Sequence, residues 1–112
     1  MAALMGAGGV MLAAASAHSG GGDLGKTASE FLLWHAAALL GVSAAARTSS
    51  TSRARRLLVA GAALALGALL FCADIAARGF LSTKLFPFAA PLGGSLTILS
   101  WFALAFVFAL TE

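Results

Sequence analysis

Residues 92–110 carry no charged side chain and are mostly apolar, and this stretch constrains the fold more than any other part of the sequence. A helix needs about 20 such residues to cross the hydrocarbon core of a bilayer. The whole chain agrees, because 61% of its residues are hydrophobic and only 10% are charged. A soluble domain has about a quarter charged residues. The sequence therefore predicts a protein embedded in lipid.

Three further apolar segments precede this one, and we expect membrane spans at approximately residues 2–17, 27–46, 57–77 and 91–110. The first segment would be about 24 Å long as a helix, which is short but sufficient where the bilayer thins around it. The predicted fold is an all-α integral membrane bundle of four transmembrane helices. It forms a single domain over residues 1–112.

Four of the seven basic residues lie within residues 47–56, namely Arg47, Arg53, Arg55 and Arg56. Small hydroxyl residues separate them, so the segment predicts a short polar loop. The positive-inside rule keeps such a cluster on the cytoplasmic side of a membrane. With four spans, both termini then lie on the cytoplasmic or matrix side. We expect a multi-pass protein of a bacterial inner membrane or, in a eukaryote, of the mitochondrial inner membrane.

The first span raises the question of processing, because residues 15–17 read Ala-Ser-Ala, as at a signal-peptidase site. No positively charged segment precedes them, so we expect a retained helix. A glycine-rich turn is predicted at residues 18–23, where three consecutive glycines disfavour a helix. Residues 78–90 predict a Phe-rich connector that lies flat in the outer interface, with Pro91 opening the last helix.

Two residues within the predicted spans could carry chemistry. Asp74 is a candidate because ionisable residues inside membrane helices are often functional. His35 belongs to the same outer half of the bundle, so the two could form an intramembrane polar pair suited to a proton relay. The alternatives are structural. Asp74 would pair with Arg78 one turn later, and His35 would hydrogen-bond across a helix pair. Trp101 would fill a gap between helices.

The sequence holds no nucleophile elbow, phosphate loop or dinucleotide fingerprint, so we do not expect an enzyme or a cofactor. His18 and Glu30 could join His35 and Asp74 at a metal, but no recognisable ligand spacing relates them, and no metal is expected. Cys72 is the only cysteine, which excludes an internal disulfide. We interpret the net charge of +3 as a topology signal, so no nucleic-acid partner is expected.

Small residues recur at three- and four-residue spacing in three of the predicted spans. This spacing lets helix backbones approach closely in a membrane. The predicted helix-packing residues are Gly9, Ala13, Ala37, Gly41, Ala45, Ala60, Ala63 and Gly67.

Three pieces of the sequence resemble a known family. They are residues 17–20, which read Ala-His-Ser-Gly, residues 30–40, which include Trp34-His35-Ala36, and residues 91–94, which read Pro-Leu-Gly-Gly and are followed by Trp101. Together they are similar to the YgdD-like small membrane proteins over nearly the whole chain. The resemblance implies a bundle of about four spans and supplies no activity, because the family has no assigned function.

Three functional hypotheses follow. In the first, the protein is a non-enzymatic structural or accessory subunit whose small-residue faces pack against other membrane subunits, or against a second copy, in a larger inner-membrane complex such as a respiratory complex. In the alternative, it is an oligomeric proton or small-solute conductor that uses His35 and Asp74. Membrane lipid is a partner in both. The third and least specific hypothesis is a lipid-binding or membrane-shaping protein that uses the Phe-rich connector and the arginine loop.

Overall fold

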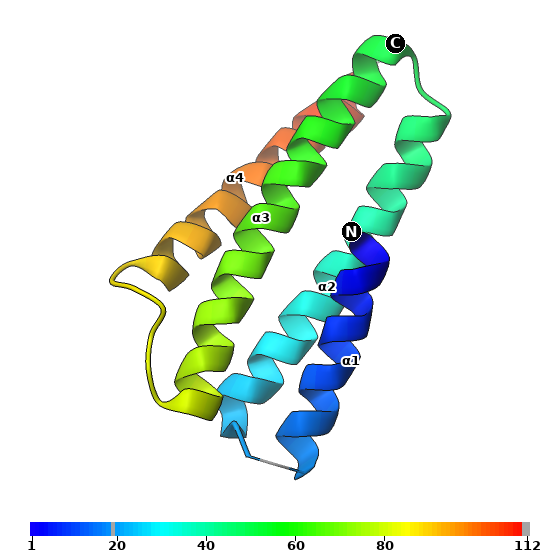
Figure 1. The fold of residues 1–112 in the computed structure, drawn as a ribbon. Coiled ribbons are helices and arrows are strands. Elements are labelled where there is room, and N and C mark those ends of the chain that lie inside the picture. Colours follow the sequence, from blue (N-terminus) through cyan, green and yellow to red (C-terminus); the bar gives the residue numbers. More distant parts are fainter. Residues whose placement is uncertain (19, 111–112) are drawn as a thin grey trace.

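The computed structural model describes residues 1–18 and 20–110, and this part of the chain is all-α (Figure 1). Its helices are α1 (Ala2–His18), α2 (Gly22–Arg47), α3 (Thr51–Leu81) and α4 (Ala89–Ala109). The predicted all-α class and the existence of four helices are confirmed. Ser19, within the predicted glycine turn, and the last two residues lie outside the described residues.

Each helix packs on the helix that follows it in the chain, so that α1 contacts α2, α2 contacts α3, and α3 contacts α4 extensively. The Cα atoms extend over 48 × 27 × 17 Å, which describes a long, flattened bundle. The N-terminus lies beside the middle of α2, while the C-terminal end of α4 lies at the same end of the bundle as the α2–α3 loop (Figure 1). The first helix therefore covers only part of α2.

Three helices, α2, α3 and α4, are long and apolar enough to cross a membrane. The first helix, with 17 residues, is a shorter apolar helix. The outward surface is apolar as well, since Leu66, Phe102 and Phe106 are each more than half exposed. A protein surface of this composition suits lipid better than water. Three of the four predicted spans thus have the required length and composition.

The predicted arginine loop is wrong over most of its length, because α3 begins at Thr51. The Ser50 side chain accepts a hydrogen bond from the backbone N–H of Arg53 at 3.3 Å and caps the helix. Arg53, Arg55 and Arg56 consequently lie on the first two turns of α3, and only residues 48–50 connect it to α2. The serine and threonine residues predict a loop, but Ser50 caps the helix and Thr51 begins it.

The connectors at the opposite end of the bundle are also shorter than predicted. Gly20 and Gly21 adopt positive φ angles of 102° and 83°, and α2 already begins at Gly22. A side chain at Gly21 would collide with Phe80, since a Cβ there would lie 2.5 Å from the ring. The helix α3 continues to Leu81, so the predicted connector of residues 78–90 contracts to residues 82–88. Glycine thus permits both the turn and the close approach of α3.

Helices α3 and α4 cross at two glycines. A Cβ at Gly67 would lie 2.8 Å from the backbone N of Thr97, and a Cβ at Gly93 would lie 2.5 Å from the backbone N of Phe71. No side chain fits between these backbones. The crossing therefore depends on two glycines. Gly67 is one of the predicted helix-packing residues, and Gly93 belongs to the Pro-Leu-Gly-Gly motif.

Candidate functional site

His35 lies on α2, is only 6% exposed, and has a hydrogen-bond partner for each ring nitrogen. Its Nδ1 is 2.7 Å from the carbonyl oxygen of Phe31, and its Nε2 is 3.1 Å from the indole Nε1 of Trp101. A carbonyl oxygen can only accept, and an indole N–H can only donate. The two partners together therefore select the neutral tautomer that carries its proton on Nδ1.

Aromatic rings surround this histidine. Phe31 stacks on His35 with ring centroids 4.2 Å apart, and Phe71 of α3 lies 4.5 Å from Phe31. Trp101 of α4 meets the imidazole edge-on at 5.8 Å. Three helices thus contribute to one aromatic cluster around His35. The sequence indicated Trp101 as a residue between helices, but it did not reveal that His35 is its partner, because the two lie 66 positions apart.

Asp74 is fully buried on α3, and both of its carboxylate oxygens accept hydrogen bonds. Arg78 donates from Nε to Oδ2 at 2.8 Å, which confirms the predicted ion pair one helical turn apart. The backbone N–H of Leu85 donates to Oδ1, also at 2.8 Å. The carboxylate thereby holds the α3–α4 connector against the end of α3. This second bond could not be predicted from the sequence.

The structure does not join His35 to Asp74. The histidine bonds to Phe31 and Trp101, whereas the aspartate bonds to Arg78 and Leu85. The proposed intramembrane pair thus consists of two separate polar sites, each with its hydrogen-bonding atoms occupied.

The remaining chemical candidates do not converge. Within residues 1–18 and 20–110, no group of three or more His, Cys, Asp or Glu side chains could hold a metal ion. The Cys72 thiol is buried and donates to the carbonyl oxygen of Ala28 at 3.5 Å. His18 and Asp23 are exposed at the glycine turn. These side chains thus do not gather at one metal site in the described part of the chain.

The predicted packing residues fall into three groups by burial. Gly9 is buried against Leu33 of α2, and Ala60 and Gly67 are buried on α3. Ala45 and Ala63 are half-buried, whereas Ala13, Ala37 and Gly41 are exposed. The first group holds the bundle together, and the last group has side-chain positions open to the outside.

Gly41 lies on the rim of a groove between α2 and α4. The groove has a volume of about 440 Å³ and is lined by Ala38, Gly41, Val42, Trp101, Leu104, Ala105 and Phe108. Apart from its chain neighbours and the nearby backbone of its own helix, no described atom lies within 4 Å of a Cβ placed on Gly41. Trp34, about two turns before Gly41 on α2, is 66% exposed. We call this groove and the adjoining exposed surface of Ala37 and Trp34 the α2–α4 face.

Comparison with known proteins gives one family. The family model described as "Protein of unknown function (DUF423)" matches residues 5–94, which include most of α1, all of α2 and α3, and the start of α4. This match agrees with the resemblance to an uncharacterised family. No solved structure matches the chain. His35, Asp74 and the four arginines lie within the matched segment, whereas Trp101 lies beyond it.

Proposed function

The chain belongs to the DUF423 family, whose function is unknown, and we propose that it is a non-enzymatic accessory subunit of a larger inner-membrane complex. The α2–α4 face would receive a transmembrane helix of a partner subunit. The arginines would lie on the cytoplasmic or matrix side, and α1 would complete a fourth span. Because α4 ends at the same end of the bundle as the α2–α3 loop (Figure 1), its C-terminal end would share the side of the arginines.

The observation that carries this proposal is Gly41. A glycine inside a helix costs about 1 kcal/mol relative to alanine. Gly9 and Gly67 are explained by close contacts with Leu33 and Thr97, but Gly41 contacts nothing in the chain that would require a missing side chain. Small residues at a membrane-helix surface let another helix approach closely. A partner helix would account for this position.

The shape and chemistry of the face support a helical partner. Ala37 and Gly41 lie one turn apart on α2, and Ala105 lies across the groove on α4. The exposed Trp34 adds a large ring beside them, and aromatic residues are frequent anchors at protein interfaces.

The conducting function has less support. A relay between His35 and Asp74 would require the two groups to exchange a proton, yet their hydrogen bonds lead to different helices and to the connector. The neutral imidazole also has its accepting nitrogen occupied by Trp101.

A cross-linking experiment tests the accessory function. A photoreactive residue would replace Trp34, whose exposed side chain on the α2–α4 face is already large, or Ala73 on the exposed side of α3 as a control, in the tagged protein in its native membrane. We expect position 34 to give one stoichiometric cross-linked product, and position 73 to give none or a different one.

A pull-down in nanodiscs provides the second readout. The same partner should co-purify with the wild type and with Ala103→Leu, which lies outside the α2–α4 face, and it should be lost with Gly41→Leu. A wild-type protein that is only a free monomer, or a Gly41→Leu variant that keeps its partner, would overturn the proposal. A product formed only between copies of this chain would replace the accessory function with self-association.

A further inference from the structure

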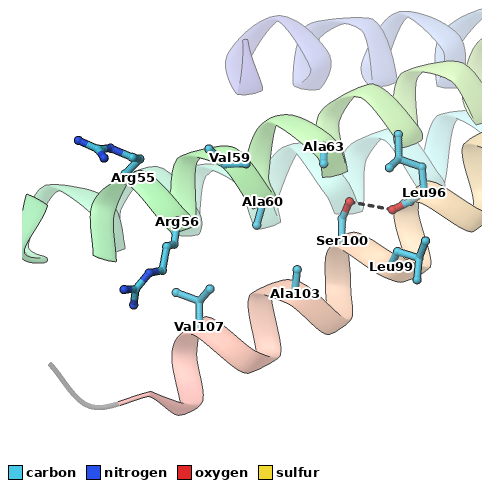
Figure 2. Close-up of a pocket in the computed structure, with 10 residues that line it drawn as sticks. All are labelled: Arg55, Arg56, Val59, Ala60, Ala63, Leu96, Leu99, Ser100, Ala103 and Val107. Carbon is cyan, nitrogen blue, oxygen red and sulfur yellow. Dashed lines mark hydrogen bonds between the residues drawn. The ribbon is translucent and has the colours of Figure 1, made fainter. Parts of the chain in front are cut away.

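A second groove lies between α3 and α4 at the arginine end of the bundle (Figure 2). It has a volume of about 480 Å³. Ala60 and Ala63 line it from α3, and Ala103 and Val107 line it from α4. Small side chains on both helices leave this space, whereas the glycines at the crossing bring the backbones together further along. The groove is independent of the α2–α4 face.

The walls of the groove are apolar. Its one hydroxyl side chain, Ser100, donates to the carbonyl oxygen of Leu96 at 2.7 Å, as Figure 2 shows, and so its proton is not available to a ligand. Leu96 and Leu99 close the end nearest the crossing. A hydrocarbon chain matches these walls, whereas a polar solute would lose its hydration there without gaining hydrogen bonds.

One arginine stands at the mouth. Arg55 and Arg56 both line the groove, and Figure 2 shows the Arg56 side chain reaching from α3 toward Val107 of α4, whereas the Arg55 guanidinium points to the other side of α3. Both side chains are exposed. They lie on the second turn of α3, and the first turn holds no acidic residue. An anion at the mouth would be stabilised by Arg56, with Arg55 adding to the positive charge nearby.

The charges of the described residues are separated along the bundle. Arg47, Arg53, Arg55 and Arg56 gather around the α2–α3 loop, whereas Asp23 begins α2 at the other end and Asp74 bonds to the α3–α4 connector there. Glu30 lies only two turns into α2 from that same end. None of the carboxylates that the structure describes thus lies at the arginine end. The mouth is complementary to an anionic ligand.

The depth of the groove agrees with the dimensions of a bilayer. Arg56 and Arg78 are 22 positions apart on α3, which corresponds to a rise of about 33 Å. The hydrocarbon core is about 30 Å thick. If α3 crosses the membrane, Arg55 and Arg56 lie at the level of the lipid phosphates, and the apolar groove extends from there into the acyl region.

We propose that this groove binds an anionic phospholipid, with one acyl chain between α3 and α4 and the phosphate on Arg56. The apolar walls fit an acyl chain, and the cationic mouth fits a negative headgroup. A ligand that matches the whole groove therefore combines the two. A zwitterionic lipid with the same chains would occupy the groove more weakly. This inference does not depend on the accessory function.

Native mass spectrometry of the detergent-solubilised protein tests the proposal. Phosphatidylglycerol and phosphatidylcholine with identical acyl chains would be added in separate titrations. We expect phosphatidylglycerol to be retained at least fivefold more, since each arginine near an anionic headgroup contributes about that factor. Glycerol phosphate at the same concentration should not displace the lipid. Equal retention of the two lipids, or displacement by glycerol phosphate, would overturn the proposal.

Matched variants locate the site. Arg56→Gln should lower phosphatidylglycerol retention about fivefold, whereas Arg47→Gln, which removes the same charge outside the groove, should lower it less. Ala103→Leu should fill the groove and reduce retention, whereas Ala105→Leu, in the α2–α4 face, should not. Equal effects of the two arginine variants would indicate diffuse surface charge and contradict the proposal. An Ala103→Leu variant with unchanged lipid retention, or one that only changes the oligomeric state, would contradict it as well.

Circular dichroism would check that each variant keeps its helical content. The two lipid titrations and the glycerol phosphate competition use the wild-type chain alone, so they decide the proposal even where a variant does not fold. The outcomes also separate the two proposals. Gly41→Leu should remove the partner without changing lipid retention, whereas Ala103→Leu should lower lipid retention and keep the partner.

Discussion

Trp101 donates its indole N–H to Nε2 of His35 over 3.1 Å, and this bond joins α4 to α2, two helices that are not consecutive in the chain. The carbonyl oxygen of Phe31 holds the opposite nitrogen of the ring. The imidazole is thus used as a connector between helices, in a tautomer that its two neighbours select.

Replacing Trp101 with phenylalanine should remove this bond and leave Nε2 of His35 without a donor. We expect the free energy of unfolding to fall by about 0.6–1.7 kcal/mol, the range measured for hydrogen bonds between membrane helices. An unfolding titration in mixed micelles would measure it. The control is Trp34→Phe, at a position that is 66% exposed, which should change the stability of the isolated chain little. Equal losses in the two variants would contradict the role of the Trp101 bond.

Substitutions at His35 and Asp74 should act independently, because the hydrogen bonds of the two side chains share no partner. In a double-mutant cycle with His35→Ala and Asp74→Ala, we expect the two changes in unfolding free energy to add within about 0.5 kcal/mol. A coupling energy well above that value would show that the two residues form the intramembrane pair after all.

Asp74→Ala should release the connector of residues 82–88, since the carboxylate accepts the Leu85 N–H. A hydrogen bond to a charged group contributes about 1.5–3 kcal/mol, so the Leu85 amide should exchange its hydrogen about tenfold faster or more. Hydrogen exchange followed by NMR in micelles would measure this rate. Arg78→Gln removes only the bond to Oδ2 and should have a smaller effect on Leu85. If Arg78→Gln accelerated exchange as much as Asp74→Ala, the ion pair rather than the Leu85 bond would hold the connector.

Gly67→Ala should destabilise the α3–α4 crossing, because the new Cβ would lie 2.8 Å from the Thr97 backbone nitrogen, which cannot move aside as a side chain can. We expect a loss of about 1–3 kcal/mol in unfolding free energy, as for overpacked cores. Gly41→Ala introduces the same methyl group in open space and should raise the stability of the isolated chain by up to about 1 kcal/mol. The reverse order of the two variants would contradict the crossing geometry.

The sequence predicted the parts of this structure that local chemistry determines. Long apolar stretches identified all four helices, and the four-residue spacing of Asp74 and Arg78 identified their ion pair. The start of α3 was misplaced because serine, threonine and arginine suit both a loop and a helix end at a membrane surface. Only the hydrogen bond from Arg53 to Ser50 distinguishes the two cases.

The contacts between distant segments could not be predicted. Because α4 is apolar on all sides, its sequence does not indicate which side faces the bundle, and Trp101 could not be assigned to His35. The bond from Leu85 to Asp74 depends on the path of a connector that contains Pro87 and a left-handed Phe88, which no helical periodicity describes. Pairing His35 with Asp74 used only their similar depth, and depth alone does not place two side chains on facing surfaces.

The order in which the helices pack has a consequence for biosynthesis. Since each extensive interface joins two consecutive helices, every helix after α1 leaves the ribosome when a main partner has already been synthesised. The helices can therefore dock in chain order, and the bond between Trp101 and His35, which joins two helices that are not consecutive, must wait for α4. A nascent chain arrested after residue 88 should therefore already protect the Gly9–Leu33 contact from labelling, and a fully accessible contact would indicate that docking begins only once α4 is present.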